Sequence, residues 1–280
     1  MMDLSGDPEE LMRRFGVQDE RPAHPKSNGQ GKPQQNAAPP AAIRVVTARE
    51  LLEMDVPARA HALAPVLPLP GLAMLYAPRG MGKTFVALCM AYAMATGGPA
   101  LKWRAEKPRR VLYCDGEMPA GALQERLASI AKGSGLELPE PDYLRFACDA
   151  LAEEAGGLPN IARPDGQAAI EDALRDGDVL VLDNLSTLAR GLRENESDDW
   201  GGLQHWLLGL RRKKKSILLI HHAGKGGQQR GTSRREDALD TVIALRRPPT
   251  TSRTRAPGSR CTWRRRAAWS APTPRRSRRL

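Results

Sequence analysis

Residues 72–88 read Leu-Ala-Met-Leu-Tyr-Ala-Pro-Arg-Gly-Met-Gly-Lys-Thr-Phe-Val-Ala-Leu, and this stretch decides the fold. A short apolar run is followed by a glycine-bearing turn and then by a helix-like pattern that starts at Lys83. This is the order of a phosphate-binding loop, in which a strand, a tight loop and a helix N-terminus follow one another. Glycines let backbone N–H groups surround an anion, and the helix N-terminus adds partial positive charge. We therefore expect a nucleotide-binding protein.

The residues expected to bind the nucleotide run consecutively along this loop. Lys83 is expected to reach the β- and γ-phosphates, and the Thr84 hydroxyl to hold Mg²⁺. The pattern G-x-x-x-x-G-K-[ST] is broken only at its first position, where Ala77 is tolerable if no positive φ is needed. The alternative is a chance glycine-rich turn between a strand and a helix. The complete set of expected nucleotide-binding residues is Ala77, Pro78, Arg79, Gly80, Met81, Gly82, Lys83, Thr84 and Phe85.

Composition limits the possible classes of protein. The net charge is +11, but ten arginines and no acidic residue lie in residues 248–280, so the rest of the chain is nearly neutral. No apolar run approaches the roughly 18 residues of a membrane span, and the acidic N-terminus is not that of a signal peptide. The four cysteines form no C-x-x-C pair, which indicates free thiols and a reducing, cytoplasmic location.

Apolar patterns alternate between strand and helix along the chain. We expect a disordered N-terminal arm at residues 1–42, because this segment is polar and rich in Pro, Gln and Gly. Strands are expected at 72–76, 111–115, 143–148, 178–183, 216–221 and 240–245. Helices are expected at 47–54, 83–95, 119–131 and 164–175, and around residues 203–210. This alternation predicts an α/β domain at 43–247, with a doubly wound, mainly parallel sheet flanked by helices.

Polar residues follow several of these strands, where ligands bind in open α/β sheets. Asp183 ends an apolar run and is a candidate to hold Mg²⁺. Glu117 is a candidate to position or deprotonate an attacking water. His221 and His222 are candidates to sense the γ-phosphate. The alternatives are a turn-forming aspartate, a helix-capping glutamate ahead of Pro119 and structural histidines. Zinc is not expected, because no cysteine or further histidine lies at ligand spacing.

Four segments in order carry a family resemblance. They are Ala77-Pro-Arg-Gly-Met-Gly-Lys-Thr, Val111-Leu-Tyr-Cys-Asp-Gly-Glu-Met-Pro, Val179-Leu-Val-Leu-Asp-Asn-Leu and Leu218-Leu-Ile-His-His-Ala-Gly-Lys. Together they resemble the RecA-like ATPases of the plasmid RepA hexameric helicase type, which are grouped with AAA-family ATPases. The resemblance covers about residues 45–247.

The resemblance implies a role for each matching residue. Glu117 would be the catalytic base and Asp183 the Mg²⁺ residue, and His221 or His222 would belong to the γ-phosphate motif. The family takes an arginine finger from a neighbouring subunit. Arg246 and Arg247 fit that place best, with Arg230 as the second candidate.

These observations predict an ATP-hydrolysing motor that uses Mg²⁺ and forms a homo-oligomer, with a hexameric ring suspected, on single-stranded DNA. Residues 223–236 would form a loop that follows the phosphates through Lys225, Arg230, Arg234 and Arg235. Two alternatives remain open. One is a non-translocating ATPase switch that binds protein partners, and the other is a truncated ATP-binding product with little turnover.

The arginine-rich segment 248–280 is expected to be a disordered tail. One interpretation is a basic arm that grips phosphates. The other is an out-of-frame reading of a GC-rich gene, because the family resemblance stops abruptly near Pro248. An out-of-frame tail would deprive the sheet of its final strands and leave an unpaired edge.

Overall fold

The structure is a computed structural model that describes residues 44–152, 156–192, 197–223, 238–246 and 260–265, with residues 197–199 and 260–265 described by their backbone alone. The chain divides into two compact units, Met1–Val56 and Pro57–Leu280. Several sequence predictions fall outside the described residues. These are the arm at 1–42, the loop cations Lys225, Arg230, Arg234 and Arg235, and the finger candidate Arg247.

The described part of the first unit contains the short helix α2 (Ala48–Glu53). Thr47 precedes it as the N-cap, and the Thr47 Oγ1 accepts a hydrogen bond from the Glu50 backbone N–H at 3.2 Å. The Glu50 carboxylate accepts one in return from the Thr47 N–H at 2.6 Å. This reciprocal pair satisfies two N–H groups that a helix start leaves unpaired, and it forms a capping box.

The second unit is built on a seven-stranded sheet in the order β11-β10-β3-β9-β8-β6-β7. All neighbouring pairs except β10–β11 are parallel. The central strands β3, β6, β8 and β9 are buried along their whole length, as sheets covered on both faces require. The strands are β3 (Gly71–Ala77), β6 (Val111–Asp115), β7 (Leu144–Cys148), β8 (Val179–Asp183), β9 (Ser216–His222), β10 (Thr241–Arg246) and β11 (Arg260–Arg265).

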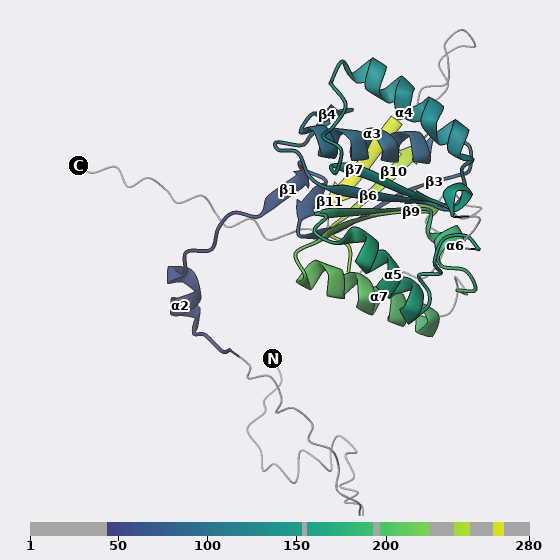
Figure 1. Cartoon of the computed structure of the whole chain (residues 1–280). Coiled ribbons are helices and arrows are strands. Elements are labelled where there is room, and N and C mark those ends of the chain that lie inside the picture. The colour runs from purple at the N-terminus through teal and green to yellow at the C-terminus, as the bar shows by residue number, and fades with distance from the viewer. Residues whose placement is uncertain (1–43, 153–155, 193–196, 224–237, 247–259, 266–280) are drawn as a thin grey trace, which may run out of the picture. The chain divides into compact units, whose positions relative to one another are not determined.

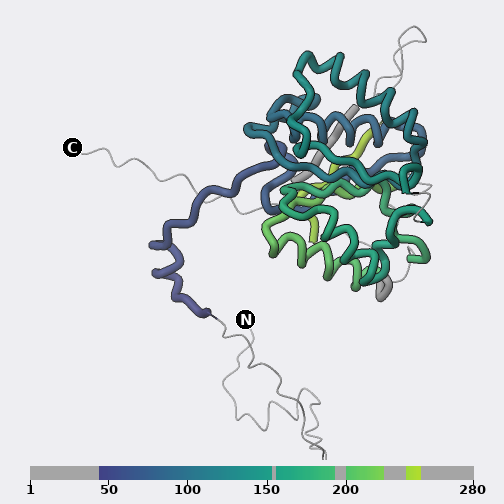
Figure 2. Tube along the Cα trace, in the orientation of Figure 1, coloured from purple at the N-terminus to yellow at the C-terminus, as the bar shows by residue number. Residues whose placement is uncertain are grey.

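Helices cover both faces of this sheet (Figures 1 and 2). On one face lie α3 (Lys83–Thr96) and α4 (Ala120–Ser134), and on the other lie α5 (Pro164–Leu174), α6 (Leu185–Leu188) and α7 (Ser197–Arg212). Successive residues of one strand therefore enter different cores. In β9, Leu218 packs in the core beneath α3, whereas Leu219 packs in the core beneath α7. The predicted doubly wound RecA-like α/β fold is confirmed.

Four parts of the fold go beyond the sequence predictions. One is the short helix α6, which directly follows β8 and Asn184. The proline-rich stretch 57–70 contains a hairpin of β1 (Ala60–Leu63) and β2 (Leu67–Leu69), and a smaller hairpin joins β4 (Pro99–Ala100) to β5 (Trp103–Arg104). A short 3₁₀-helix, η1 (Asp149–Leu151), follows β7.

The strand β11 lies inside the segment for which a disordered tail was expected. It pairs antiparallel with β10 from Thr241↔Arg265 to Arg246↔Arg260. Within this strand the sequence contains Thr262 and Trp263, which are residue types that favour strands. The edge of β10 is thus covered by a further strand. None of the helices in the described part combines the length and apolar character needed to cross a membrane.

Candidate functional site

The phosphate-binding loop joins β3 directly to α3. Gly80 and Gly82 have φ values of 74° and 82°, so both lie in the left-handed region, where glycine is favoured. Gly82 is also the N-cap of α3. Ala77, at the position where the usual pattern has glycine, is the last residue of β3 and has no positive φ. Alanine therefore meets no conformational barrier at this position, as the sequence predicted.

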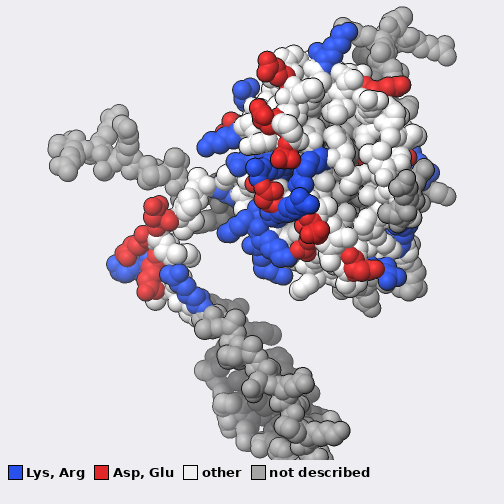
Figure 3. Space-filling view, viewed as in Figure 1, with Lys and Arg blue, Asp and Glu red and all other residues white. Residues whose placement is uncertain are grey.

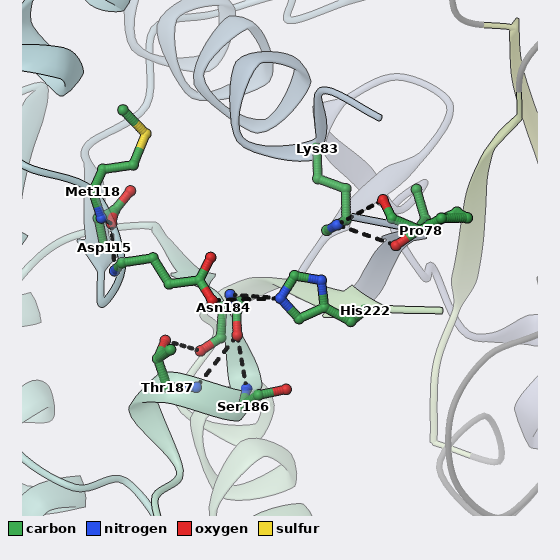
Figure 4. A network of polar contacts seen from close by, with 10 residues as sticks. Pro78, Lys83, Asp115, Met118, Asn184, Ser186, Thr187 and His222 are labelled. Carbon is green, nitrogen blue, oxygen red and sulfur yellow. Dashed lines mark hydrogen bonds and ion pairs between the residues drawn. The ribbon is translucent and has the colours of Figure 1, made fainter. Parts of the chain in front are cut away.

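Lys83 is buried, and its amino group points back at the loop (Figure 4). Its Nζ donates to the carbonyl oxygens of Ala77 and Pro78, each at 3.1 Å. Burial lowers the pKa of Lys83, whereas the nearby Asp183 and Glu117 carboxylates raise it. The loop's own carbonyl groups thus hold a largely desolvated ammonium group beside the glycine turn.

A cleft of about 740 Å³ opens between this loop and the ends of β6, β8 and β9. The loop contributes one wall, and residues that follow the three strands contribute the other, because the carboxyl ends of parallel strands share one edge. The lining residues are Arg79, Gly80, Gly82, Lys83, Thr84, Phe85, Glu117, Met118, Arg126, Asp183, Asn184 and His222.

Asp183 ends β8 with its carboxylate almost fully buried. The Tyr113 hydroxyl on β6 donates to the Asp183 Oδ2 at 2.6 Å. Burial raises the pKa of Asp183 to about 6, and hydrogen bonds from Tyr113 and Thr84 oppose this rise. Burial also raises the pKa of Tyr113 well above its usual value, so the tyrosine remains a hydrogen-bond donor. Asp183 is therefore held in place between the loop and β6.

Asp115 ends β6 in register with Asp183 on β8. The Asp115 Oδ1 accepts hydrogen bonds from the backbone N–H groups of Glu117 and Met118, at 2.9 and 2.7 Å. Burial raises the pKa of Asp115, and these two hydrogen bonds oppose the rise. Among the described residues, its buried Oδ2 has no hydrogen-bond partner. Asp115 therefore shapes the turn that presents Glu117 to the cleft.

Gly116 allows this turn to lie close to β8 and α6. Its N–H donates to the Asp183 carbonyl oxygen at 2.8 Å. A Cβ added at Gly116 would lie only 2.6 Å from the Thr187 Oγ1. Any larger residue would therefore move the turn, and Glu117 with it.

Asn184 links α6 to the histidine of β9 (Figure 4). Its Oδ1 accepts hydrogen bonds from the N–H groups of Ser186 and Thr187, at 3.0 and 3.3 Å. The amide orientation is thereby fixed, so the Nδ2 faces the His222 Nε2 at 3.2 Å. Because an amide nitrogen can only donate, the His222 Nε2 accepts and the ring carries its proton on Nδ1.

The same ring nitrogen lies 3.4 Å from the Glu117 Oε1. A neutral His222 cannot donate to Glu117 from Nε2 while it accepts there from Asn184. Burial lowers the pKa of His222, as does Lys83 nearby, while Glu117 raises it. Protonation of His222 would therefore replace the Asn184 contact with an ion pair to Glu117.

The structure does not bring every predicted residue to the cleft. Met81 packs into the core. Ala77 and Pro78 do not line the cleft, and their carbonyl oxygens accept hydrogen bonds from Lys83. His221 lines a separate cavity of about 70 Å³ on the α6 side, because adjacent residues of a strand point to opposite faces. Arg246 is exposed at the end of β10 and does not line the cleft.

Five residues around the site were not predicted as site residues. Asn184, Met118 and Arg126 line the cleft, and Tyr113 and Asp115 support it from β6. Asp115 is the polar end of the Val111–Asp115 strand, which is a local signal for it, whereas Tyr113 lies in the middle of that strand. Arg126 comes from the middle of α4, and it reaches the cleft only because of the path that the helix takes over the sheet.

A sequence model of the AAA domain family matches residues 37–228, well over half of the chain. The chain belongs to this family. Its fold is that of a RecA-like P-loop ATPase, and the family uses a nucleotide, typically with Mg²⁺. No curated protein sequence matches the chain.

Two solved structures are similar to this AAA-family chain. The KaiC-like protein from Pyrococcus horikoshii OT3 has 15% sequence identity and a TM-score of 0.49, with 74% of this chain and 88% of that chain covered. The flagellar accessory protein FlaH from Methanocaldococcus jannaschii has 14% identity and a TM-score of 0.45, with 66% and 75% covered.

The raised pKa of Asp183 predicts how the stability of the ligand-free protein depends on pH. Because the folded-state value of about 6 exceeds the ordinary 3.8, the unfolded chain loses this proton first as pH rises. The free energy of unfolding should thus fall between pH 4 and 6, and Asp183→Asn should remove about 3 kcal/mol of cost above pH 6.

Urea denaturation across this pH range, without nucleotide and with a chelator, measures the effect. The exposed carboxyl of Asp172 on α5 provides the control through Asp172→Asn, whose curve should run parallel to that of the wild type. Parallel curves for Asp183→Asn and the wild type would show that burial of Asp183 carries no such cost.

Proposed function

We propose that the protein is an ATP-hydrolysing motor of the plasmid RepA helicase type that works as a ring on single-stranded DNA. The observation that supports this best is the convergence of Lys83, Thr84, Asp183, Glu117 and His222 on one cleft. This set supplies a phosphate loop, a carboxylate for a metal, a general base and a γ-phosphate sensor. The four sequence segments of the RepA resemblance contain the same residues.

The residues beside the loop fit a magnesium ion. The Thr84 hydroxyl and the Asp183 carboxylate are hydrogen-bonded neighbours, and both offer oxygen ligands. Mg²⁺ is usually held by one or two protein oxygens together with phosphates and water. In this proposal Thr84 and Asp183 hold the ion, directly or through water, and the bound ion neutralises charge on the phosphates. Lys83 leaves the loop carbonyls and pairs with the β- and γ-phosphates.

Glu117 takes the role of general base. It accepts a proton from the attacking water, whose oxygen then bonds to the γ-phosphorus as the bond to ADP breaks. Glu117 lies in the cleft wall opposite Lys83, on a turn fixed by Asp115. His222, within 3.4 Å of Glu117, is positioned to respond to the γ-phosphate, whereas His221 faces another cavity.

The proposed ring would complete the site. Arg79, Lys83 and Arg126 line the cleft from the same chain, while Arg246 is exposed at the carboxyl end of β10. Arg246 or Arg247 would then act in the cleft of a neighbouring subunit, where such a finger accelerates hydrolysis by about 10³- to 10⁵-fold. The cations of residues 225–235 would contact DNA phosphates, coupling them to His222 at the end of β9.

The substitution Glu117→Gln should leave ATP binding nearly unchanged and slow hydrolysis by about 10²-fold or more, because the amide cannot accept the proton. Phosphate release at saturating ATP measures the rate, and calorimetry measures binding. Glu125→Gln on the exposed face of α4 is the matched control and should hydrolyse ATP normally. Normal turnover by Glu117→Gln would leave Glu117 as a residue of the turn only.

Single-stranded DNA should stimulate ATP hydrolysis by the wild type, because a motor couples turnover to contact with its track. Replacing Lys225, Arg234 and Arg235 with alanine should remove the stimulation and preserve the basal rate. Steady-state hydrolysis with and without an oligonucleotide gives both quantities. A wild-type rate that saturating DNA leaves unchanged would contradict the motor and favour a non-translocating switch.

A further inference from the structure

The edge of the sheet opposite the cleft carries a concentration of positive charge. Three segments lead into adjacent strands at this edge: residues 107–110 precede β6, residues 175–178 precede β8 and residues 211–215 precede β9. Together they contain nine basic residues and two acidic ones. We call the nine residues the basic edge: Lys107, Arg109, Arg110, Arg175, Arg211, Arg212, Lys213, Lys214 and Lys215.

Hydrogen bonds join the three segments into one surface. The Asp178 N–H donates to the Arg110 carbonyl oxygen at 2.8 Å, and the Ser216 N–H donates to the Asp178 carbonyl oxygen at 2.9 Å. The Lys215 Nζ also donates to the Arg175 carbonyl oxygen at 3.2 Å. Figure 3 shows Lys and Arg side chains gathered on this side of the ATPase unit, with a few acids among them.

Part of this charge is left without a partner. Arg110 pairs with Asp176, Lys213 with Glu171 and Arg211, at 3.9 Å, with Asp240. Within the described part of the chain, the other six residues of the basic edge form no ion pair. Of these six, four are exposed: Lys107, Arg175, Arg212 and Lys214. The surface therefore presents unneutralised cations to solvent, which attract polyanions.

The backbone gives an independent reason to regard these cations as functional. Only three non-glycine residues of the described chain have positive φ: Leu101, Arg175 and Lys214. Arg175 caps α5 with φ 48° and ψ −119°, and Lys214 has φ 64° just after α7. Glycine would adopt either conformation without strain. At both turns the chain carries a basic side chain although the backbone conformation favours glycine. This suggests that the positive charge has a function.

We propose that the basic edge binds the sugar-phosphate backbone of double-stranded nucleic acid, independently of base sequence and of ATP. Lysine is depleted in protein–protein interfaces, whereas lysine and arginine are the residues that contact phosphates. The three segments contain no aromatic residue, so they lack the stacking groups that bind unpaired bases. This surface is therefore suited to contacts with the phosphates of a regular duplex.

The triple variant R175G/R212A/K214G tests this proposal, because it removes three exposed cations and places glycine at both strained positions. It should fold as stably as the wild type and hydrolyse ATP at the wild-type basal rate, since none of the three residues touches the cleft. The variant R44A/R49A/R163A is the matched control, because it removes three exposed cations outside the basic edge and lowers the net charge equally.

Fluorescence anisotropy of a short labelled DNA duplex of mixed sequence, without ATP and over a range of salt concentrations, provides the readout in the full chain. The triple variant should bind about tenfold or more weakly, and its slope of log K against log salt should be smaller by about 2 to 3. The control variant should bind like the wild type, and a shuffled duplex should bind equally well.

Two results would overturn the proposal. Equal loss of binding in the triple variant and the control would mean that net charge, and not this surface, holds the duplex. Competition by polyglutamate of matched charge as strong as that by unlabelled duplex would assign the surface to acidic proteins instead. Wild-type ATP hydrolysis in the triple variant keeps this test separate from that of the proposed motor.

Discussion

The parallel pairing of β6 with β8 is the constraint on which the site depends. It places Asp115 beside Asp183 and lets the Tyr113 hydroxyl reach Asp183 across the two strands. The turn after Asp115 then presents Glu117 to the cleft, at the edge where β3 delivers the phosphate loop. The register of these two strands thus sets the positions of Asp183, the proposed metal carboxylate, and Glu117, the proposed general base, relative to the loop.

Burial gives this site its electrostatic character. The pKa of Asp183 is raised to about 6 and that of Lys83 is lowered, so each charged form is held at a cost. A phosphate group brings negative charge to Lys83, and a divalent cation brings positive charge to Asp183. We therefore expect a bound ligand to stabilise the charged forms of Lys83 and Asp183, whose burial the ligand-free fold compensates poorly. The His222 Nε2 likewise lies within reach of two groups, the Asn184 amide and the Glu117 carboxylate.

Sequence patterns predicted the sheet and most of the cleft, because buried strands are continuous apolar runs and their polar ends meet at one edge. They did not predict which of His221 and His222 faces the cleft, since that depends on the phase of β9 relative to the sheet. Arg126 was missed because only the packing of α4 on the sheet brings it to the cleft. The basic edge was missed because its charge is divided among three distant segments, within a chain body that is nearly neutral in total.

In the proposed mechanism the cleft binds a magnesium nucleotide through Lys83. Thermal unfolding with a non-hydrolysable ATP analogue and Mg²⁺ tests this most directly. At a hundredfold excess over Kd, the ligand should stabilise the wild type by about 2.7 kcal/mol, and Lys83→Ala should abolish this stabilisation. Lys132→Ala, on the exposed end of α4, should behave like the wild type. Equal stabilisation of Lys83→Ala and the wild type would contradict this account of the cleft.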